Sequence, residues 1–369
     1  MSLSSSGSLS SFFSTIHLIC LRLWNNEVIY LNSLEAVEAV VIYGMLWRLS
    51  SAPVVGGGPK GFAGLPFSFL PPEQRYIGSF RQVMKIHCFG HRMYNTSTLF
   101  SPIKLPSQME THLWYTLPNE VKSESLLSQY VDLLPPHEKD HIFSITNLQL
   151  QKTALLARAL VRTTISRYQI GSQISPRSLE FRKNIHGKPE VIWQSKDDWN
   201  PPPLHFNLSH TSSLIACGVT IDSPIGIDVE DKKRTTKNNI LSFAKRYFTH
   251  EEVEFLSAIS DLEVQRHEFI KLWTLKEAYV KALGRGFSGA PFSTFTIRLR
   301  SQECGIVIVP LENPTDLTTN WQFAQVELAE SHYASICRES DGGDPLKVIV
   351  RKTIPLVEEH IVSEIISFV

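Results

Sequence analysis

Residues 206–230 read FNLSHTSSLIACGVTIDSPIGIDVE, and the last seven of them decide the fold. In PIGIDVE three apolar side chains alternate with a glycine and two carboxylates, Asp228 and Glu230. A period of two is typical of a strand with one buried face. It places the two carboxylates on one face, where they repel each other unless a hydrogen bond, a raised pKa or a divalent cation compensates. A Mg²⁺ site is one such solution, and a solvated strand face is the other interpretation.

The strongest helix pattern lies downstream, in FIKLWTLKEAYVKALGRG, residues 269–286. Its apolar residues follow one stripe, and Trp273, Glu277 and Lys281 recur every fourth residue on the neighbouring face. The Gly-Arg-Gly sequence predicts the end of the helix. A Glu–Lys pair at this spacing usually stabilises a helix surface. This helix is apolar on most sides, where an unpaired charge is costly, so we expect both side chains at a site.

Three motifs in this order resemble those of the Sfp-type 4'-phosphopantetheinyl transferases: NLSH at 207–210, GIDVE at 226–230 and WTLKEAYVKALGRG at 273–286. The resemblance covers residues 109–338 and includes the eukaryotic aminoadipate-semialdehyde dehydrogenase-phosphopantetheinyl transferase type, with plants among the expected sources. It implies an α+β fold of two similar lobes with pseudo-two-fold symmetry and the active site between them. It also implies transfer of 4'-phosphopantetheine from coenzyme A to a serine of an acyl or peptidyl carrier protein, with release of 3',5'-ADP.

The resemblance further implies the roles of the site residues. Mg²⁺ is expected on Asp228, Glu230 and Glu277, with Glu277 also the general base and Lys281 beside the departing phosphate. Some relatives lack the second carboxylate of the strand, so Glu230 is expected to help without being essential. Coenzyme A is expected to contact residues in four segments: Lys152, Lys183, Gly187, Lys188, Pro189, Ser209 and His210. For Lys152 a solvated helix face is an equally good interpretation.

Composition bounds the classes of partner. The chain has 369 residues with 36 basic and 36 acidic side chains, so neither a nucleic acid nor a membrane is an expected partner. A Mg²⁺-dependent nuclease would need similar carboxylates but also a basic surface. A non-catalytic carrier-protein-binding homologue is the other alternative, and the presence of Asp228, Glu277 and Lys281 argues against it. A monomer is expected, and the natural carrier protein stays open.

The predicted domains are a disordered or targeting-like extension (1–83), a linker (84–108), an N-terminal lobe (109–205), a C-terminal lobe (206–345) and a C-terminal tail (346–369). The Ser-rich start without acidic residues is compatible with a transit peptide. Five scattered cysteines without C-x-x-C spacing favour a reducing compartment. The cytosol is therefore expected, with a mitochondrion or plastid as the alternative. Fatty-acid biosynthesis and lysine metabolism through aminoadipate are the expected settings.

Alternation and capping signals predict the remaining elements. Strands are expected at 111–117 and 205–208, two short strands around a turn at 180–193, and a long helix within 147–170. The segment 214–221 is expected to form a hairpin with 226–230. Helices are expected at 240–248 and 249–259, the second with a Thr249–Glu252 capping box. Four strands, 292–299, 306–311, 321–328 and 332–338, are expected in an antiparallel sheet, and the segment from 346 has no assigned place.

Overall fold

The computed structural model describes residues 102–168, 175–193, 203–235, 239–300, 305–310, 320–340 and 345–367. All of them belong to the second of two units, Gly64–Val369. The predicted extension over residues 1–83, and most of the predicted linker, lie outside the described residues. Within the described ranges, no helix combines the length and the apolar character that crossing a bilayer requires.

Runs of helices and runs of strands follow one another along the chain, which is the α+β pattern. The helices are α4 (Glu124–Asp132), α5 (Pro136–Ser144), α6 (Leu148–Ser166), α7 (Ile240–Tyr247), α8 (His250–Ser257), α9 (Leu262–Leu283) and α10 (Gly286–Gly289). The strands are β1 (Glu110–Thr116), β2 (Glu180–Lys183), β3 (Pro189–Ile192), β4 (Leu204–His210), β5 (Ile215–Ile221), β6 (Ile225–Asp231), β7 (Phe295–Arg300), β8 (Gly305–Pro310), β9 (Asn320–Leu328), β10 (His332–Ser340), β11 (Leu346–Ile354) and β12 (Glu358–Ser367).

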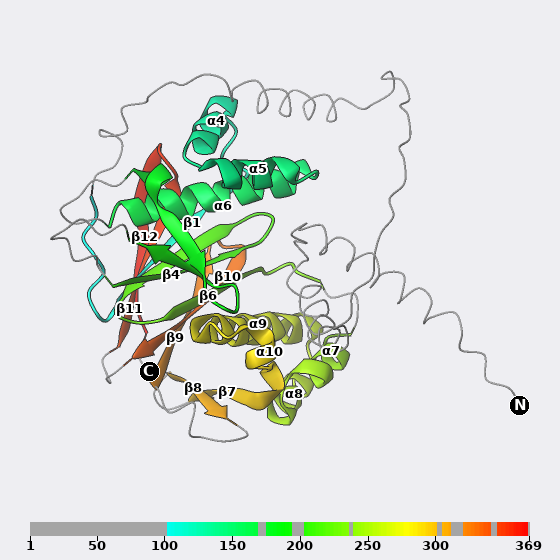
Figure 1. Ribbon diagram of the computed structural model, residues 1–369. Coiled ribbons are helices and arrows are strands. Elements are labelled where there is room, and N and C mark those ends of the chain that lie inside the picture. Colours follow the sequence, from blue (N-terminus) through cyan, green and yellow to red (C-terminus); the bar gives the residue numbers. More distant parts are fainter. Residues whose placement is uncertain are drawn as a thin grey trace, which may run out of the picture. The chain divides into compact units, whose positions relative to one another are not determined.

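Most of the strands in the described residues belong to two sheets (Figure 1). The larger has the order β12-β11-β1-β5-β4, in which β1 and β11 pair in parallel and the other neighbours are antiparallel. The smaller is antiparallel, in the order β6-β10-β9, with Asp228 opposite Ser335. β2 pairs with β3, and β7 pairs with β8, in two separate two-stranded antiparallel sheets.

One apolar core joins the two sheets. Its buried side chains come from β1, β5 and β11 of the larger sheet and from β6, β9 and β10 of the smaller one. The predicted alternation of β6 is confirmed, because Ile225, Ile227 and Val229 lie in this core, and Gly226 lies against α9. A strand with a strict period of two therefore presents Asp228 and Glu230 to the helix on its other face.

One long helix accompanies each sheet (Figure 1). Helix α6 contacts β1, β4 and β5, and α9 contacts β6, β9 and β10. Helix α6 begins where the Asn147 side chain accepts a hydrogen bond from the Leu150 amide. Helix α9 begins at the Asp261 cap and ends at Gly284, whose φ of 62° is a left-handed conformation that glycine adopts without strain. The capping box of Thr249 and Glu252 is present, as predicted.

Several sequence-based predictions about strand partners are wrong. The expected hairpin between β5 and β6 does not form, because β5 pairs with β1 and β4 and β6 pairs with β10. The four late strands divide between the β7–β8 pair and the smaller sheet. The segment from 346 forms β11 and β12 of the larger sheet instead of a separate tail. The predicted boundary at 205/206 falls inside β4, and the smaller sheet begins with β6.

Candidate active site

The edges of the two sheets meet along β4 and β6. Here two side chains of β4, instead of its backbone, accept hydrogen bonds from β6. The Ile227 amide donates to Asn207 Oδ1 at 2.9 Å, and the Val229 amide donates to Ser209 Oγ at 3.2 Å. Asn207 and Ser209 are both buried. The NLSH motif thus fixes the position of the GIDVE strand, a role that the sequence analysis did not give to Asn207.

The glycine of GIDVE lets α9 lie directly on β6. A Cβ atom at Gly226 would lie 2.0 Å from the Ala278 carbonyl oxygen and 2.2 Å from the Ala282 amide nitrogen. Any side chain at this position would therefore push the helix away from the strand. The close approach brings the last turns of α9 over Asp228.

A lysine, a carboxylate and a hydroxyl meet at this junction. Lys281 Nζ lies 2.6 Å from Asp228 Oδ1 and donates to Ser209 Oγ at 3.2 Å. The Ser209 hydroxyl donates to the same Asp228 oxygen at 3.0 Å. The Lys281 side chain is 28% exposed, whereas that of Asp228 is 4% exposed. Three of the predicted site residues, from two motifs and the helix, are thus in direct contact.

Glu277 lies one turn before Lys281 and is half-buried. Burial raises the pKa of Glu277 to about 7; the Asp228 and Glu230 carboxylates raise it as well, and the Lys281 ammonium opposes them. Burial opposes the charge of Lys281, but Asp228 and Glu277 outweigh this effect and raise its pKa. Burial and the Lys281 cation lower the pKa of His210. Asp228, Glu230, Glu277, Lys281 and His210 therefore form one group of interacting charges.

The second strand carboxylate has a partner that was not predicted from the sequence. Glu230 forms an ion pair with Arg234, four residues later. The Arg234 guanidinium also lies 5.9 Å from the centroid of the Trp273 ring. The one available signal was the spacing of four residues between a carboxylate and an arginine, which is weak after a strand.

The donor set suits a hard cation. Asp228 Oδ2 is buried and has no hydrogen-bond partner among the described residues. Carboxylate oxygens are the ligands that Mg²⁺ prefers. The described ranges nevertheless hold no group of three or more His, Cys, Asp or Glu side chains that is arranged to bind a metal ion. Asp228 Oδ1 faces Lys281 and Glu230 faces Arg234, so Asp228 Oδ2 is the atom of this pair of carboxylates whose chemistry fits a cation.

The turn between β2 and β3 is attached to the end of α9. Lys188 Nζ donates to the carbonyl oxygens of Ile225 at 2.8 Å and Ala282 at 3.2 Å. The Asn184 side chain donates to the Gly284 carbonyl oxygen and accepts from the Lys188 amide. Burial lowers the pKa of Lys188 to about 8. In this structure Lys188 therefore supports the C-terminus of α9, a favourable place for a cation.

The other predicted coenzyme A residues are dispersed. Gly187 occupies the β2–β3 turn with a φ of 90°, and Pro189 begins β3. Lys183 is exposed at the end of β2 and acts electrostatically on His141. Burial and the nearby Lys122 lower the pKa of Lys152, in the second turn of α6. The hydrogen bonds and ion pairs of the described residues link neither Lys152 nor Lys183 to the Asp228 group.

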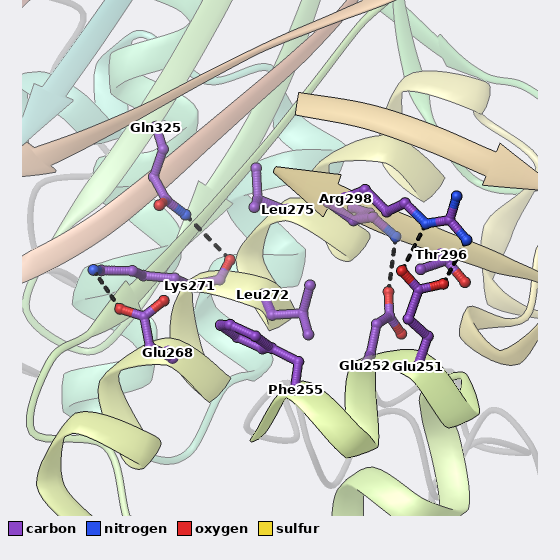
Figure 2. A pocket seen from close by; sticks show the side chains of 11 residues that line it. Glu251, Glu252, Phe255, Glu268, Lys271, Leu272, Leu275, Thr296, Arg298 and Gln325 are labelled. Carbon is purple, nitrogen blue, oxygen red and sulfur yellow. Dashed lines mark hydrogen bonds and ion pairs between the residues drawn. The ribbon is translucent and has the colours of Figure 1, made fainter. Parts of the chain in front are cut away.

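A separate cavity of about 300 Å³ lies on the other side of α9 (Figure 2). Phe255 of α8 and Leu272 and Leu275 of α9 form its apolar part, and two ion pairs, Glu251–Arg298 and Glu268–Lys271, stand beside it. None of the predicted site residues lines this cavity. Glu277 and Lys281, the predicted catalytic residues, and the cavity-lining side chains thus occupy different faces of the same helix.

Known proteins match most of the described chain. The family model for the 4'-phosphopantetheinyl transferase N-terminal region matches residues 121–220, and the model for the 4'-phosphopantetheinyl transferase superfamily matches residues 224–337. The 4'-phosphopantetheinyl transferase Sfp of Bacillus subtilis is 30% identical over 171 residues, which span 46% of this chain and 69% of that protein.

A human protein and a solved structure are also similar. The human L-aminoadipate-semialdehyde dehydrogenase-phosphopantetheinyl transferase is 25% identical over 232 residues, 60% of this chain and 72% of that protein. The structure of a holo-(acyl-carrier-protein) synthase from Bacillus anthracis in complex with CoA (3',5'-ADP) superposes with a TM-score of 0.27 and 17% identity. It covers 32% of this chain and 96% of that one.

Proposed function

This chain belongs to the 4'-phosphopantetheinyl transferase superfamily, and on that premise we propose that it transfers 4'-phosphopantetheine from coenzyme A to a carrier-protein serine. The acceptor is a serine of an acyl or peptidyl carrier protein. The serine oxygen forms a new bond to the phosphorus next to the pantetheine arm. The pyrophosphate bond breaks, and 3',5'-ADP leaves with the electron pair of the bridging oxygen.

One observation carries this proposal. The family motifs NLSH, GIDVE and WTLKEAYVKALGRG meet at a single point, where Lys281 contacts both Asp228 and Ser209. Asp228 and Ser209 are buried and held by strand geometry, so the group is preorganised. Preorganised charges at the position where charge develops are the main means by which proteins accelerate phosphoryl transfer.

Asp228, Glu230 and Glu277 would hold a Mg²⁺ ion in this site. Asp228 Oδ2, which has no hydrogen-bond partner among the described residues, and the neighbouring Glu277 carboxylate support this assignment. When bound, the ion would supply positive charge to the pyrophosphate oxygens.

The chain's own groups handle the proton and the leaving phosphate. Glu277 is the general base for the serine hydroxyl, since its carboxylate lies one turn before Lys281 and interacts with Asp228. Lys281 remains protonated, because its carboxylate neighbours raise its pKa. Its ammonium therefore stabilises the negative charge that grows on the departing phosphate.

Coenzyme A would lie over the edge where β4 ends and the β2–β3 turn meets α9. His210, at the end of β4, and Lys188, Gly187 and Pro189 of the turn are the proposed contacts on this edge. Ser209, already bonded to Asp228, would act mainly by holding that carboxylate. Lys152 and Lys183 would contact the nucleotide farther from the reacting bond.

Labelled coenzyme A and a panel of purified carrier proteins test this function. The panel contains fatty-acid-synthase, mitochondrial and aminoadipate-reductase types, since similarity to the human aminoadipate-type enzyme makes the last a candidate. We expect Mg²⁺-dependent labelling of at least one carrier and equimolar 3',5'-ADP, both abolished by EDTA. Binding of carriers without transfer would instead identify a non-catalytic homologue. Cleavage of nucleic acid under the same conditions would identify a nuclease.

We further propose that the protein acts as a monomer in the cytosol, without nucleic-acid or membrane partners. Its neutral composition supports the absence of such partners. Imaging of the full-length protein beside a variant that begins at Met84 distinguishes the cytosol from a mitochondrion or plastid. Residence in the cytosol of both forms is the expected result.

A further inference from the structure

The Glu230–Arg234 pair adds a feature to the proposed site. Glu230 is buried on the β6 face that α9 covers, and the Arg234 side chain is 13% exposed. A hydrogen-bonded pair of this kind is normally stable, because each charge would lose its water shell without the other. Here, however, Glu230 stands two residues from a carboxylate whose second oxygen has no partner among the described residues.

Hydrogen bonds within the turn after β6 place the Arg234 guanidinium beside Glu230 of that strand. The Lys233 amide donates to Asp231 Oδ1 at 2.8 Å, and the Arg234 amide donates to the Asp231 carbonyl oxygen at 2.9 Å. Arg266 of α9 donates to the Lys232 carbonyl oxygen and so attaches the turn to the helix. The position of Arg234 beside Glu230 therefore follows from the fold of the turn and not from chance contact of two long side chains.

Each strand carboxylate thus has a cation from the chain itself. Lys281 neutralises Asp228, and Arg234 neutralises Glu230. The Trp273 ring beside Arg234 offers the guanidinium a favourable aromatic face whether or not it bonds the carboxylate.

We propose that Arg234 is a displaceable internal cation that competes with the divalent metal for Glu230. This inference rests on the proposed function, because it concerns the same metal site. In the metal-free protein Arg234 holds Glu230 and prevents repulsion between the carboxylates. On metal binding Glu230 would exchange the guanidinium for the ion, and Arg234 would keep its contact with the Trp273 ring. Arg234 therefore weakens metal binding by the free energy of the pair that must be broken.

Direct metal titration tests the inference without reference to activity. The probe is Mn²⁺, followed by calorimetry and by its paramagnetic resonance signal, with Mg²⁺ as competitor. We expect Arg234→Gln to bind Mn²⁺ about tenfold more tightly than the wild type, the fold-change expected when one charge-assisted hydrogen bond no longer competes. Circular dichroism and thermal melts check that each variant folds.

A matched control separates competition from the general loss of a positive charge. Lys233 is exposed, is one residue away, and its side chain contacts no carboxylate among the described residues. Lys233→Gln removes the same charge and should leave Mn²⁺ affinity within about twofold of the wild type, because exposed charges are screened. In a double variant, Glu230→Gln should abolish the gain produced by Arg234→Gln, because the shared carboxylate is then absent.

Two results would overturn the inference: unchanged or weaker Mn²⁺ binding by folded Arg234→Gln, or an equal gain in Lys233→Gln. Weaker binding would mean that Arg234 orients Glu230 toward the metal instead of competing for it. Failure of the proposed function looks different, since the wild type would then transfer nothing from coenzyme A to any carrier, whatever the Mn²⁺ affinities of the variants.

Discussion

Helix α9 carries two lysine–carboxylate pairs whose N–O distances are both 2.6 Å, and their surroundings differ completely. Lys276 pairs with Glu252, and the two side chains are 0% and 2% exposed. Lys276 Nζ also donates to the Phe295 carbonyl oxygen at 2.6 Å and lies 4.2 Å from the centroid of the Phe295 ring. Glu252 accepts further hydrogen bonds from the Ile297 and Thr249 amides. Both oxygens of Glu252 are therefore satisfied.

The Lys281–Asp228 pair is incomplete. Its lysine is 28% exposed, and one oxygen of its aspartate has no hydrogen-bond partner among the described residues. Burial lowers the pKa of Lys276 to about 8, against the pull of Glu252, whereas the pKa of Lys281 is raised by its carboxylate neighbours. A complete pair stabilises a fold, and an incomplete pair next to solvent leaves coordination sites for a metal and a substrate.

The largest expected effect is on catalysis, at Glu277 beside the incomplete Lys281–Asp228 pair. Glu277→Gln keeps the shape of the side chain but cannot accept a proton, so turnover should fall by about 10²- to 10⁴-fold with coenzyme A binding largely kept. Excess Mg²⁺ should not restore it. The matched control is Glu268→Gln on the cavity face of α9, for which we expect nearly wild-type turnover. Steady-state kinetics measure both. Rescue of Glu277→Gln by Mg²⁺ would show that Glu277 is only a metal ligand and make Glu230 the first candidate base.

The complete pair should affect stability instead. Lys276→Met leaves the Glu252 carboxylate buried without its cation, which should lower the free energy of unfolding by about 3–5 kcal/mol. Lys271→Met is the control, since its partly exposed pair with Glu268 is worth at most about 1 kcal/mol. Urea denaturation compares the two. Equal losses would show that burial does not distinguish these pairs.

A smaller effect concerns pH. The folded-state pKa of Glu277, about 7, lies above its ordinary value of 4.5. Its contribution to stability is therefore complete below pH 4.5 and is lost as the pH rises through 7. In EDTA, Glu277→Gln should be more stable than the wild type above pH 7, by on the order of 2 kcal/mol, and should gain nothing near pH 4.5. Denaturation series across this range, read as the difference between the two proteins, check the sign. A difference that is constant with pH would exclude the raised pKa.

The sequence predicted the parts of the site that depend on local periodicity. The alternation in β6 and the spacing of Glu277 and Lys281 on α9 both act within a few residues. The burial of Ile225, Ile227 and Val229 confirms the first, and Lys281 reaches Asp228 from the helix as the second predicts. Strand partners depend on contacts between distant segments. β6 pairs with β10 instead of the expected β5, and β11 pairs in parallel with β1. No pattern within either strand's own sequence indicates these partners.

Polar partners were predicted least well, for a related reason. Lys188 has the charge expected of a phosphate ligand, but its reach to the Ile225 and Ala282 carbonyl oxygens depends on how the β2–β3 turn is placed against α9. The return of Arg234 to Glu230 likewise depends on a turn that Arg266 holds from the helix.

The most direct test of the account compares the two lysines in one experiment. Single-turnover transfer from saturating coenzyme A to a carrier protein is followed by intact mass, below the melting temperature of every variant. We predict that Lys281→Met lowers the rate by about 10²-fold or more with little change in coenzyme A affinity, because it removes one preorganised charge from the reacting phosphate. Lys276→Met should keep the wild-type rate. A wild-type rate in Lys281→Met, or an equal loss in both, would contradict the assignment of catalysis to the incomplete pair.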